Sequence, residues 1–257
     1  MKAVYIRLFA LVALVLSMNG CKSDDSGDDP NDPKAENLKS LGVSAEDLLS
    51  EDIYNSLTVE FIYVNGYQPL QETVDLFRVM LEDRLNKPGG INFIENVISI
   101  PIDESLTIQE IRDIETANRE VYTTGDNIAV YIYFANGNSN NDTNTSVTLG
   151  TAYRNTSLVV YEKTLQFLSG NQGIDLVVLE ATTLMHEFGH ILGLVNIVND
   201  DIHQEHEDLN HANHCFVEEC LMYFESTNFR ALANKRRSEI PGFDPLCIAD
   251  LQAKGGK

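Results

Sequence analysis

Apolar residues recur along residues 57–134 at two different spacings, which separate the expected strands from the expected helices. Residues 57–65 alternate in polarity and residues 91–101 are rich in Ile, Val and Phe, so both segments favour strands. The apolar positions between them recur every three or four residues, as on one face of a helix: Leu70, Val74, Phe77, Leu81 and Leu85. Residues 127–134 are almost continuously apolar and predict a buried central strand.

A second helix is expected ahead of this central strand, because Thr107 and Glu110 form a capping box before further apolar residues. Strands that alternate with helices pair in parallel. Two more strands are expected at residues 147–153 and 157–164, the first as an antiparallel edge strand with which an extended peptide could pair. Residues 136–145 are expected to be a solvated polar loop, with a calcium site as the alternative.

The fold class that this order predicts is α+β with an α/β-like N-terminal part. The expected sheet is twisted and mostly parallel, with an antiparallel edge strand. A small C-terminal subdomain is expected to include a short helix through Leu251, which Asp244 and Pro245 begin. A single domain is expected over residues 51–257, because a chain of this length with 43% hydrophobic residues can build a full core.

The segment with the clearest chemistry is His186-Glu187-Phe-Gly-His190, which lies in an apolar run that is expected to be a helix. Residues four apart on a helix lie one above the other, so the two imidazoles face one point and suit a zinc ion. Glu187 lies at the edge of that face, where a carboxylate can reach a metal-bound water and act as a general base. Gly193 is expected to end the helix in a left-handed conformation. The alternative is a core helix that carries two histidines and no metal.

Residues 1–20 have the features of an export signal. Lys2 and Arg7 precede an apolar stretch that is too short for a permanent membrane span, and the segment ends in a glycine before Cys21. This junction resembles a lipobox, whose cysteine is acylated, so a lipid anchor is expected on Cys21, with ordinary cleavage and an unmodified thiol as the alternative. Residues 21–50 begin with an acidic tract and are expected to be a flexible tether.

Charge and cysteine number limit the partners. The formal charge of −21 argues against nucleic acid, because a phosphate backbone would be repelled. If Cys21 is acylated, three cysteines remain: Cys215, Cys220 and Cys247. In an oxidising compartment this odd number favours one disulfide and one buried thiol over a metal cluster. Cys215 and Cys220 are a candidate pair, with the connectivity left open.

The order of elements and the His-Glu-x-x-His-x-x-Gly helix resemble the metzincin zinc peptidases. The family's third histidine would stand at Asn196, and an amide is a poor zinc ligand. Farther along, His214-Cys215-Phe-Val-Glu-Glu-Cys220-Leu-Met222 looks like the His-Cys-x4-Cys-x-Met segment of archaemetzincins. That resemblance implies His214 as the third zinc ligand and Met222 as the methionine turn beneath the metal. Archaemetzincins bind a second zinc with four cysteines, and this chain has only three nearby, so a single catalytic zinc is expected.

The chain also resembles the bacterial lipoproteins called membrane metalloproteases, from the lipobox-like junction to its closing residues. Among the histidines of the acidic segment that follows the motif, His211 is the reserve choice for the third ligand. His203 and His206 are interpreted as exposed or supporting residues. A gluzincin would instead use one of four downstream glutamates: Glu205, Glu207, Glu218 or Glu219.

The expected function is that of a zinc-dependent endopeptidase that hydrolyses peptide bonds at the bacterial cell surface or in the periplasm. Zinc would be held by His186, His190 and His214, and Glu187 would take the proton of the bound water. The protein is expected to be an exported outer-membrane lipoprotein, monomeric and exposed at the surface, that acts on proteins or peptides. The alternative is a non-proteolytic surface lipoprotein of the same fold that binds a protein or glycan partner.

Overall fold

The structure is a computed structural model that describes residues 32–101 and 105–257. The expected export signal, the lipobox-like Cys21 and the first part of the expected tether lie outside the described residues. The strands are β1 (Ser56–Val64), β2 (Gly90–Ile98), β3 (Ser105–Leu106), β4 (Asn127–Phe134), β5 (Asn138–Ser139), β6 (Gly150–Arg154) and β7 (Ser157–Val160). The α-helices are α1 (Ala45–Leu49), α2 (Gln71–Arg84), α3 (Ile108–Asn118), α4 (Glu162–Gln172), α5 (Leu176–Ile191), α6 (Phe229–Leu232) and α7 (Pro245–Ala253). The short 3-10 helices are η2 (Ala35–Asn37), η3 (Gln204–His206) and η4 (Arg237–Glu239).

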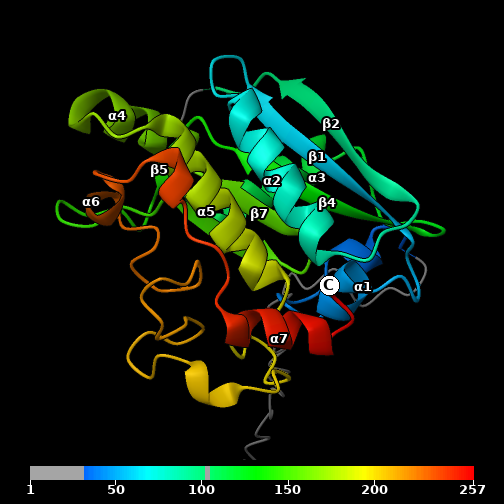
Figure 1. The fold of residues 1–257 in the computed structure, drawn as a ribbon. Coiled ribbons are helices and arrows are strands. Elements are labelled where there is room, and N and C mark those ends of the chain that lie inside the picture. Colours follow the sequence, from blue (N-terminus) through cyan, green and yellow to red (C-terminus); the bar gives the residue numbers. More distant parts are fainter. Residues whose placement is uncertain (1–31, 102–104) are drawn as a thin grey trace, which may run out of the picture.

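A five-stranded sheet with the order β2-β1-β4-β7-β6 forms the centre of the fold (Figure 1). The first four strands in this order pair in parallel, and β6 pairs antiparallel with β7 at the edge. Strand β4 is buried from Ile128 to Phe134, as its continuous apolar sequence predicts. The small β3–β5 ladder is separate and parallel. The predicted fold class, a mostly parallel sheet with an antiparallel edge strand, is confirmed.

Helices cover both faces of the sheet. On one face α2 and α5 lie side by side (Figure 1), and the Phe77 and Phe188 rings meet edge to face with centroids 5.2 Å apart. Phe61 of β1 packs into the same core. On the other face, Ile111 of α3 packs with Tyr131 of β4 in a second core. The capping box that Thr107 and Glu110 predict begins α3.

The predicted boundary between tether and domain at residue 51 is wrong. Leu48 and Leu49 of α1 are fully buried in the main core, so residues before 51 belong to the folded domain. Asn37 is buried as well. Its side-chain Nδ2 donates to Thr123 Oγ1 at 3.0 Å, and its side-chain Oδ1 accepts from the Thr123 backbone N–H at 2.7 Å. A buried amide with these partners fixes the chain in place.

The predicted strand at residues 157–164 is too long. Strand β7 ends at Val160, and the chain enters α4 at Glu162. Leu165 and Leu168 of α4 face the main core at helical spacing, and this contact outweighs the β-favouring run before it. The expected polar loop at residues 136–145 contains the two-residue strand β5. No helix within the described ranges is long and apolar enough to cross a membrane.

The burial of Leu48 gives a direct test of the corrected domain boundary. We expect Leu48→Ala to lower the free energy of unfolding by about 2–5 kcal/mol, because it leaves a cavity in the core. Ile53, which is 62% exposed, provides the matched control, and Ile53→Ala should change the free energy by about 0.5 kcal/mol or less. Urea unfolding of both variants makes the comparison. If both variants changed the free energy of unfolding by a similar, small amount, residues 35–50 would belong to the tether.

Candidate active site

Helix α5 carries the His-Glu-x-x-His motif through the interior of the molecule. Asp175 caps its first turn by accepting from the Val177 backbone N–H at 2.9 Å. Every residue from Val177 to Ile191 is buried, as expected for a helix that is apolar around most of its circumference. The helix ends at Ile191, and Gly193 adopts the expected left-handed conformation with φ of 72°. The motif side chains therefore lie in a poorly solvated environment.

Three histidines converge at the C-terminal half of α5. Each offers one ring nitrogen, and these three atoms from His186, His190 and His214 all lie within 4.8 Å of one another. The Nε2 atoms of His186 and His190 are 3.2 Å apart. The His214 ring centroid lies 5.3 Å from that of His186 and 5.1 Å from that of His190. The structure thus brings together the three histidines that the sequence analysis selected.

Backbone carbonyls orient two of these imidazoles. His186 Nδ1 lies 2.7 Å from the Leu221 carbonyl oxygen, and His214 Nδ1 lies 3.0 Å from that of Ala212. A carbonyl can only accept, so both Nδ1 atoms carry the proton and both Nε2 atoms keep a lone pair. Ser226 Oγ, 3.0 Å from His186 Nδ1, donates to the same Leu221 carbonyl. The Nε2 lone pairs of His186 and His214 are therefore available to bind a metal ion.

Burial also keeps the three imidazoles neutral. Desolvation lowers the pKa of His186 to about 4 and that of His190 well below its usual value, because the cationic form loses its hydration. The pKa of His214 is lowered for the same reason. Neutral imidazole is the form that binds metal ions, so at neutral pH no proton has to be removed from this cluster.

Glu187 faces the edge strand β6. Its Oε2 accepts from the Ala152 backbone N–H at 2.8 Å. Burial raises the pKa of Glu187 to about 7, and the hydrogen bond from Ala152 opposes that rise. A Cβ atom at Gly150 would lie 2.6 Å from Glu187 Cγ, so the close approach of the strand requires a glycine. A cleft of about 340 Å³ between β6 and the histidines contains Glu187 in its wall.

Met222 lies against α5 at Gly189. It is fully buried, and a Cβ atom at Gly189 would overlap its sulfur atom. The segment that carries Met222 also supplies the Leu221 carbonyl that orients His186. The structure therefore places Met222 next to the helix turn that carries His186 and His190, where the archaemetzincin-like segment predicts a methionine turn.

The other candidate ligands lie elsewhere. His211 pairs with Asp208 at 2.7 Å and has a side chain that is 41% exposed, and it is not a member of the three-histidine group. Asn196, where a metzincin would have its third histidine, donates instead to Gln204 and Glu207. The four glutamates of the gluzincin alternative are absent from the metal-compatible groups found among the described residues: Glu205, Glu207, Glu218 and Glu219.

Two expectations about the same region are wrong. His206 is neither exposed nor an outlying support, because it is fully buried beside Cys215 and Cys247. The expected disulfide between Cys215 and Cys220 is not formed in the structure, where all three described cysteines are free and buried. The sulfur atoms of Cys215 and Cys247 lie near His206, and that of Cys220 lies 3.6 Å from Cys247 Sγ, which is a different arrangement from one bonded pair and one isolated thiol.

One solved structure has a similar fold. An archaemetzincin from Methanopyrus kandleri matches 78% of this chain and 96% of its own, with a TM-score of 0.50 and 16% sequence identity. The chain shares the fold of archaemetzincin. No protein-family model matches the sequence, and no curated protein matches it.

Sequence reasoning did not find the groups that support the site. The contacts of Glu187 with Ala152 and of His186 with Ser226 and the Leu221 carbonyl join segments far apart in the chain. Backbone donors and acceptors leave no mark in a sequence. Only Gly150, within a strand otherwise suited to larger residues, is a sequence signal for a close approach.

The contact between Gly189 and Met222 leads to a stability prediction. We expect Gly189→Ala to lower the free energy of unfolding by about 1–3 kcal/mol, because the added methyl group overlaps the Met222 sulfur. Gly170 in α4 has open space around its Cβ position, so Gly170→Ala should stabilise the protein by about 0.5–1 kcal/mol. Chemical unfolding of the two variants should give opposite signs. A stabilising Gly189→Ala would show that Met222 does not pack there.

Proposed function

We propose that the protein is a zinc-dependent endopeptidase, with His186, His190 and His214 as zinc ligands and Glu187 as the general base. The observation that carries this proposal is the convergence of three neutral imidazoles beside a buried carboxylate with a raised pKa. The fold shared with archaemetzincin supports the same class of activity. With His214 as the third ligand, the histidine missing at Asn196 is replaced, and this supports the peptidase over the non-proteolytic alternative.

The donor set fits a catalytic zinc ion. Two imidazole nitrogens that each lie about 2.0–2.1 Å from a tetrahedral ion are about 3.3 Å apart, close to the 3.2 Å between His186 Nε2 and His190 Nε2. Three protein ligands leave the fourth position open, as in catalytic zinc sites. The Nδ1–H groups of His186 and His214 are held by carbonyls, which fixes the ring orientation that a metal requires.

Bound zinc would polarise the scissile carbonyl and make a bound water acidic. Glu187 has one oxygen held by the Ala152 N–H, so its other oxygen, Oε1, is the atom that takes the proton of the attacking water. A carboxyl whose pKa is about 7 can release that proton again to the leaving amine. Its burial keeps bulk water from exchanging the proton during the reaction.

A peptide substrate is supported by the position of β6. This strand forms the outer edge of the sheet, and Gly150 and Ala152 line the cleft together with Glu187. An extended peptide laid along β6 would pair with its backbone and pass over the three histidines. Recognition through the backbone holds a peptide without selecting every side chain, as an endopeptidase requires.

The role of Glu187 is tested by Glu187→Gln. We expect this variant to keep its zinc and to lose about 10²–10⁴-fold in kcat on a peptide substrate, because the amide cannot accept the proton. His186→Ala should lose both the zinc and the activity. Elemental analysis and a peptide assay on the same samples separate the two outcomes. Loss of zinc from Glu187→Gln would show that the carboxylate is a ligand instead.

The third ligand is tested by a pair of neighbouring histidines. We expect His214→Ala to weaken zinc binding by more than about 100-fold, since two imidazoles leave the site incomplete. His211→Ala should leave the affinity unchanged, because His211 pairs with Asp208 outside the cluster. Competition with a zinc chelator measures both affinities. If the two results were exchanged, His211 would be the ligand.

We also propose that the protein is an exported lipoprotein of the outer membrane, exposed at the cell surface and anchored through Cys21. A basic start, a short apolar stretch and a glycine before Cys21 support this proposal. Cells fed a labelled fatty acid should incorporate it into the wild-type protein and not into Cys21→Ser, which should leave the membrane fraction. A labelled Cys21→Ser protein in the membrane fraction would place the anchor elsewhere.

A further inference from the structure

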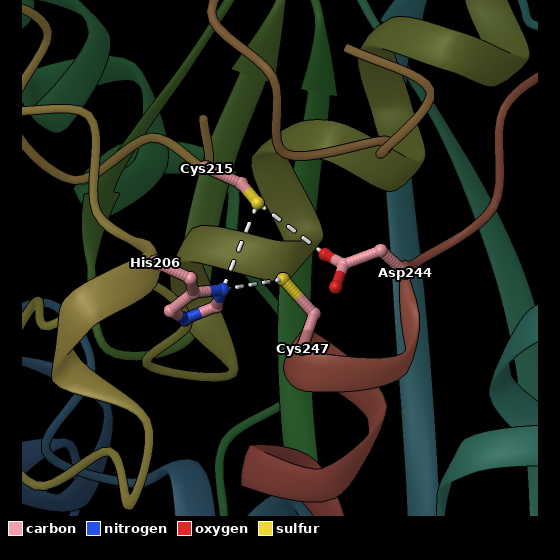
Figure 2. Close-up of side chains that lie close together, drawn as sticks. All are labelled: His206, Cys215, Asp244 and Cys247. Atoms are coloured by element: carbon pink, nitrogen blue, oxygen red, sulfur yellow. Dashed lines mark hydrogen bonds between the residues drawn. The ribbon is translucent and has the colours of Figure 1, made fainter. Parts of the chain in front are cut away.

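Four buried side chains form a second group that the proposed peptidase chemistry does not use. Figure 2 shows His206, Cys215 and Cys247 directed toward one another, with Asp244 beside them. His206 Nδ1 lies 3.6 Å from Cys215 Sγ and 3.9 Å from Cys247 Sγ. Cys220 Sγ lies 3.6 Å from Cys247 Sγ. The histidine and all three cysteines are fully buried.

Backbone N–H groups donate to two of the sulfur atoms. Cys215 Sγ accepts from the Val217 N–H at 3.4 Å. Cys220 Sγ accepts from the N–H groups of Met222 at 3.3 Å and Asp244 at 3.4 Å. N–H donors directed at sulfur stabilise the thiolate, which is the form that binds metal ions. Each of these two cysteines therefore sits in a loop that is already shaped to hold a charged sulfur.

A carboxylate lies next to the His206 ring nitrogen that does not face the sulfur atoms. Asp250 Oδ2 lies 3.1 Å from His206 Nε2, while its other oxygen accepts from the His203 backbone N–H at 3.0 Å. Asp250 is fully buried. The two atoms are close but not in hydrogen-bond geometry; the nearby carboxylate favours the ring proton at Nε2, and a proton there leaves the Nδ1 lone pair for the sulfur side. His206 Nδ1 therefore faces the sulfur atoms of Cys215 and Cys247, and it is within hydrogen-bonding distance of both.

We propose that His206, Cys215, Cys220 and Cys247 bind a structural zinc ion, separate from the one at the three histidines. In a tetrahedral site with Zn–S near 2.3 Å and Zn–N near 2.0 Å, two sulfurs are about 3.8 Å apart and sulfur and nitrogen about 3.5 Å apart. The 3.6 Å between the sulfurs of Cys220 and Cys247, and the 3.6 and 3.9 Å from His206 Nδ1 to the sulfurs of Cys215 and Cys247, fit this geometry. On binding, the thiols lose their protons to solvent and no redox change occurs.

Asp244 is the competing fourth ligand, because its Oδ2 lies 3.3 Å from Cys215 Sγ. Its other oxygen caps α7 by accepting from the Leu246 N–H at 2.8 Å, so this side chain already has a structural task. A soft thiolate is the better partner for a site that already has two sulfurs. Cys220 therefore completes the set, and Asp244 lies next to the site.

The ligand set differs from the four cysteines of archaemetzincins, because a histidine from the 194–213 insertion takes one place. The ion would connect three parts of the chain: the insertion through His206, the segment after His214 through two cysteines, and α7 through Cys247. Cys215 directly follows His214, and Cys220 precedes Met222 by two residues. Four protein ligands leave no open position, so the role of this ion is structural. It would hold the third histidine of the neighbouring site in place.

The test uses Co²⁺ in place of zinc on the full chain. Cobalt bound to thiolates gives a near-ultraviolet charge-transfer absorption that the three-histidine site, which has no sulfur, does not give. We expect the wild type to bind one Co²⁺ with this absorption, and zinc analysis to give two ions per chain. A folded wild type with no such absorption, or a disulfide among the three cysteines in protein purified from an oxidising compartment, would overturn the proposal.

Variants identify the ligands. The charge-transfer absorption measures the Co²⁺ affinity of each variant. Cys220→Ala and His206→Ala should each lower this affinity by more than about 100-fold, and Asp250→Asn should lower it by about 10–100-fold. Asp244→Asn is the matched control, since asparagine also caps helices, and it should bind as the wild type does. Far-ultraviolet circular dichroism confirms that each variant is folded. If Asp244→Asn lost the metal and Cys220→Ala kept it, the ligand set proposed here would be wrong.

Wild-type thiols should resist alkylation until a chelator removes the ion, which tests the site without any substitution.

Discussion

The packing of the 215–226 segment against α5 at Gly189 is the contact on which the candidate active site depends. Because residue 189 has no side chain, Met222 reaches the helix backbone between the two motif histidines. The same approach places the Leu221 carbonyl at His186 Nδ1 and brings His214 over the helix. A larger residue at position 189 would push this segment away and separate the third imidazole from the other two.

Burial then determines the chemistry of the residues that this contact brings together. A helix that is enclosed from Val177 to Ile191 offers its polar side chains little hydration, so the imidazoles stay neutral and the Glu187 carboxyl holds its proton more strongly. The Ala152 N–H limits the second effect and ties the base to the edge strand. Sheet edge, base and metal-compatible nitrogens therefore share one cleft, which is the geometry that peptide hydrolysis needs.

The sequence predicted the features that depend on local spacing. The continuous apolar run of β4, the capping box of α3 and the four-residue interval between His186 and His190 all follow from one segment at a time. The sequence predicted the structure less well where contacts between distant segments determine it. Leu48 and Leu49 follow a polar tract and were assigned to the tether, and residues 162–164, which begin α4, were assigned to the end of a strand.

The site shows the same division. His214 was chosen through the likeness of its segment to archaemetzincins, and spacing alone did not separate it from His203, His206 and His211. The cysteine group was missed because its fourth member, His206, comes from an insertion whose path no local pattern describes. An odd number of cysteines suggested a disulfide and a spare thiol, whereas the fold brings Cys215 and Cys247 to His206 and places Cys220 beside Cys247. The insertion therefore has a structural task in this account.

The most direct test of the central claim is a crystal structure with anomalous diffraction data collected at the zinc absorption edge. The account predicts a peak about 2.0–2.1 Å from one ring nitrogen each of His186, His190 and His214. A fourth position on the side of Glu187 and β6 should be filled by water. A zinc-bearing crystal with no peak among these three histidines, or with a peak that His214 does not contact, would contradict the account.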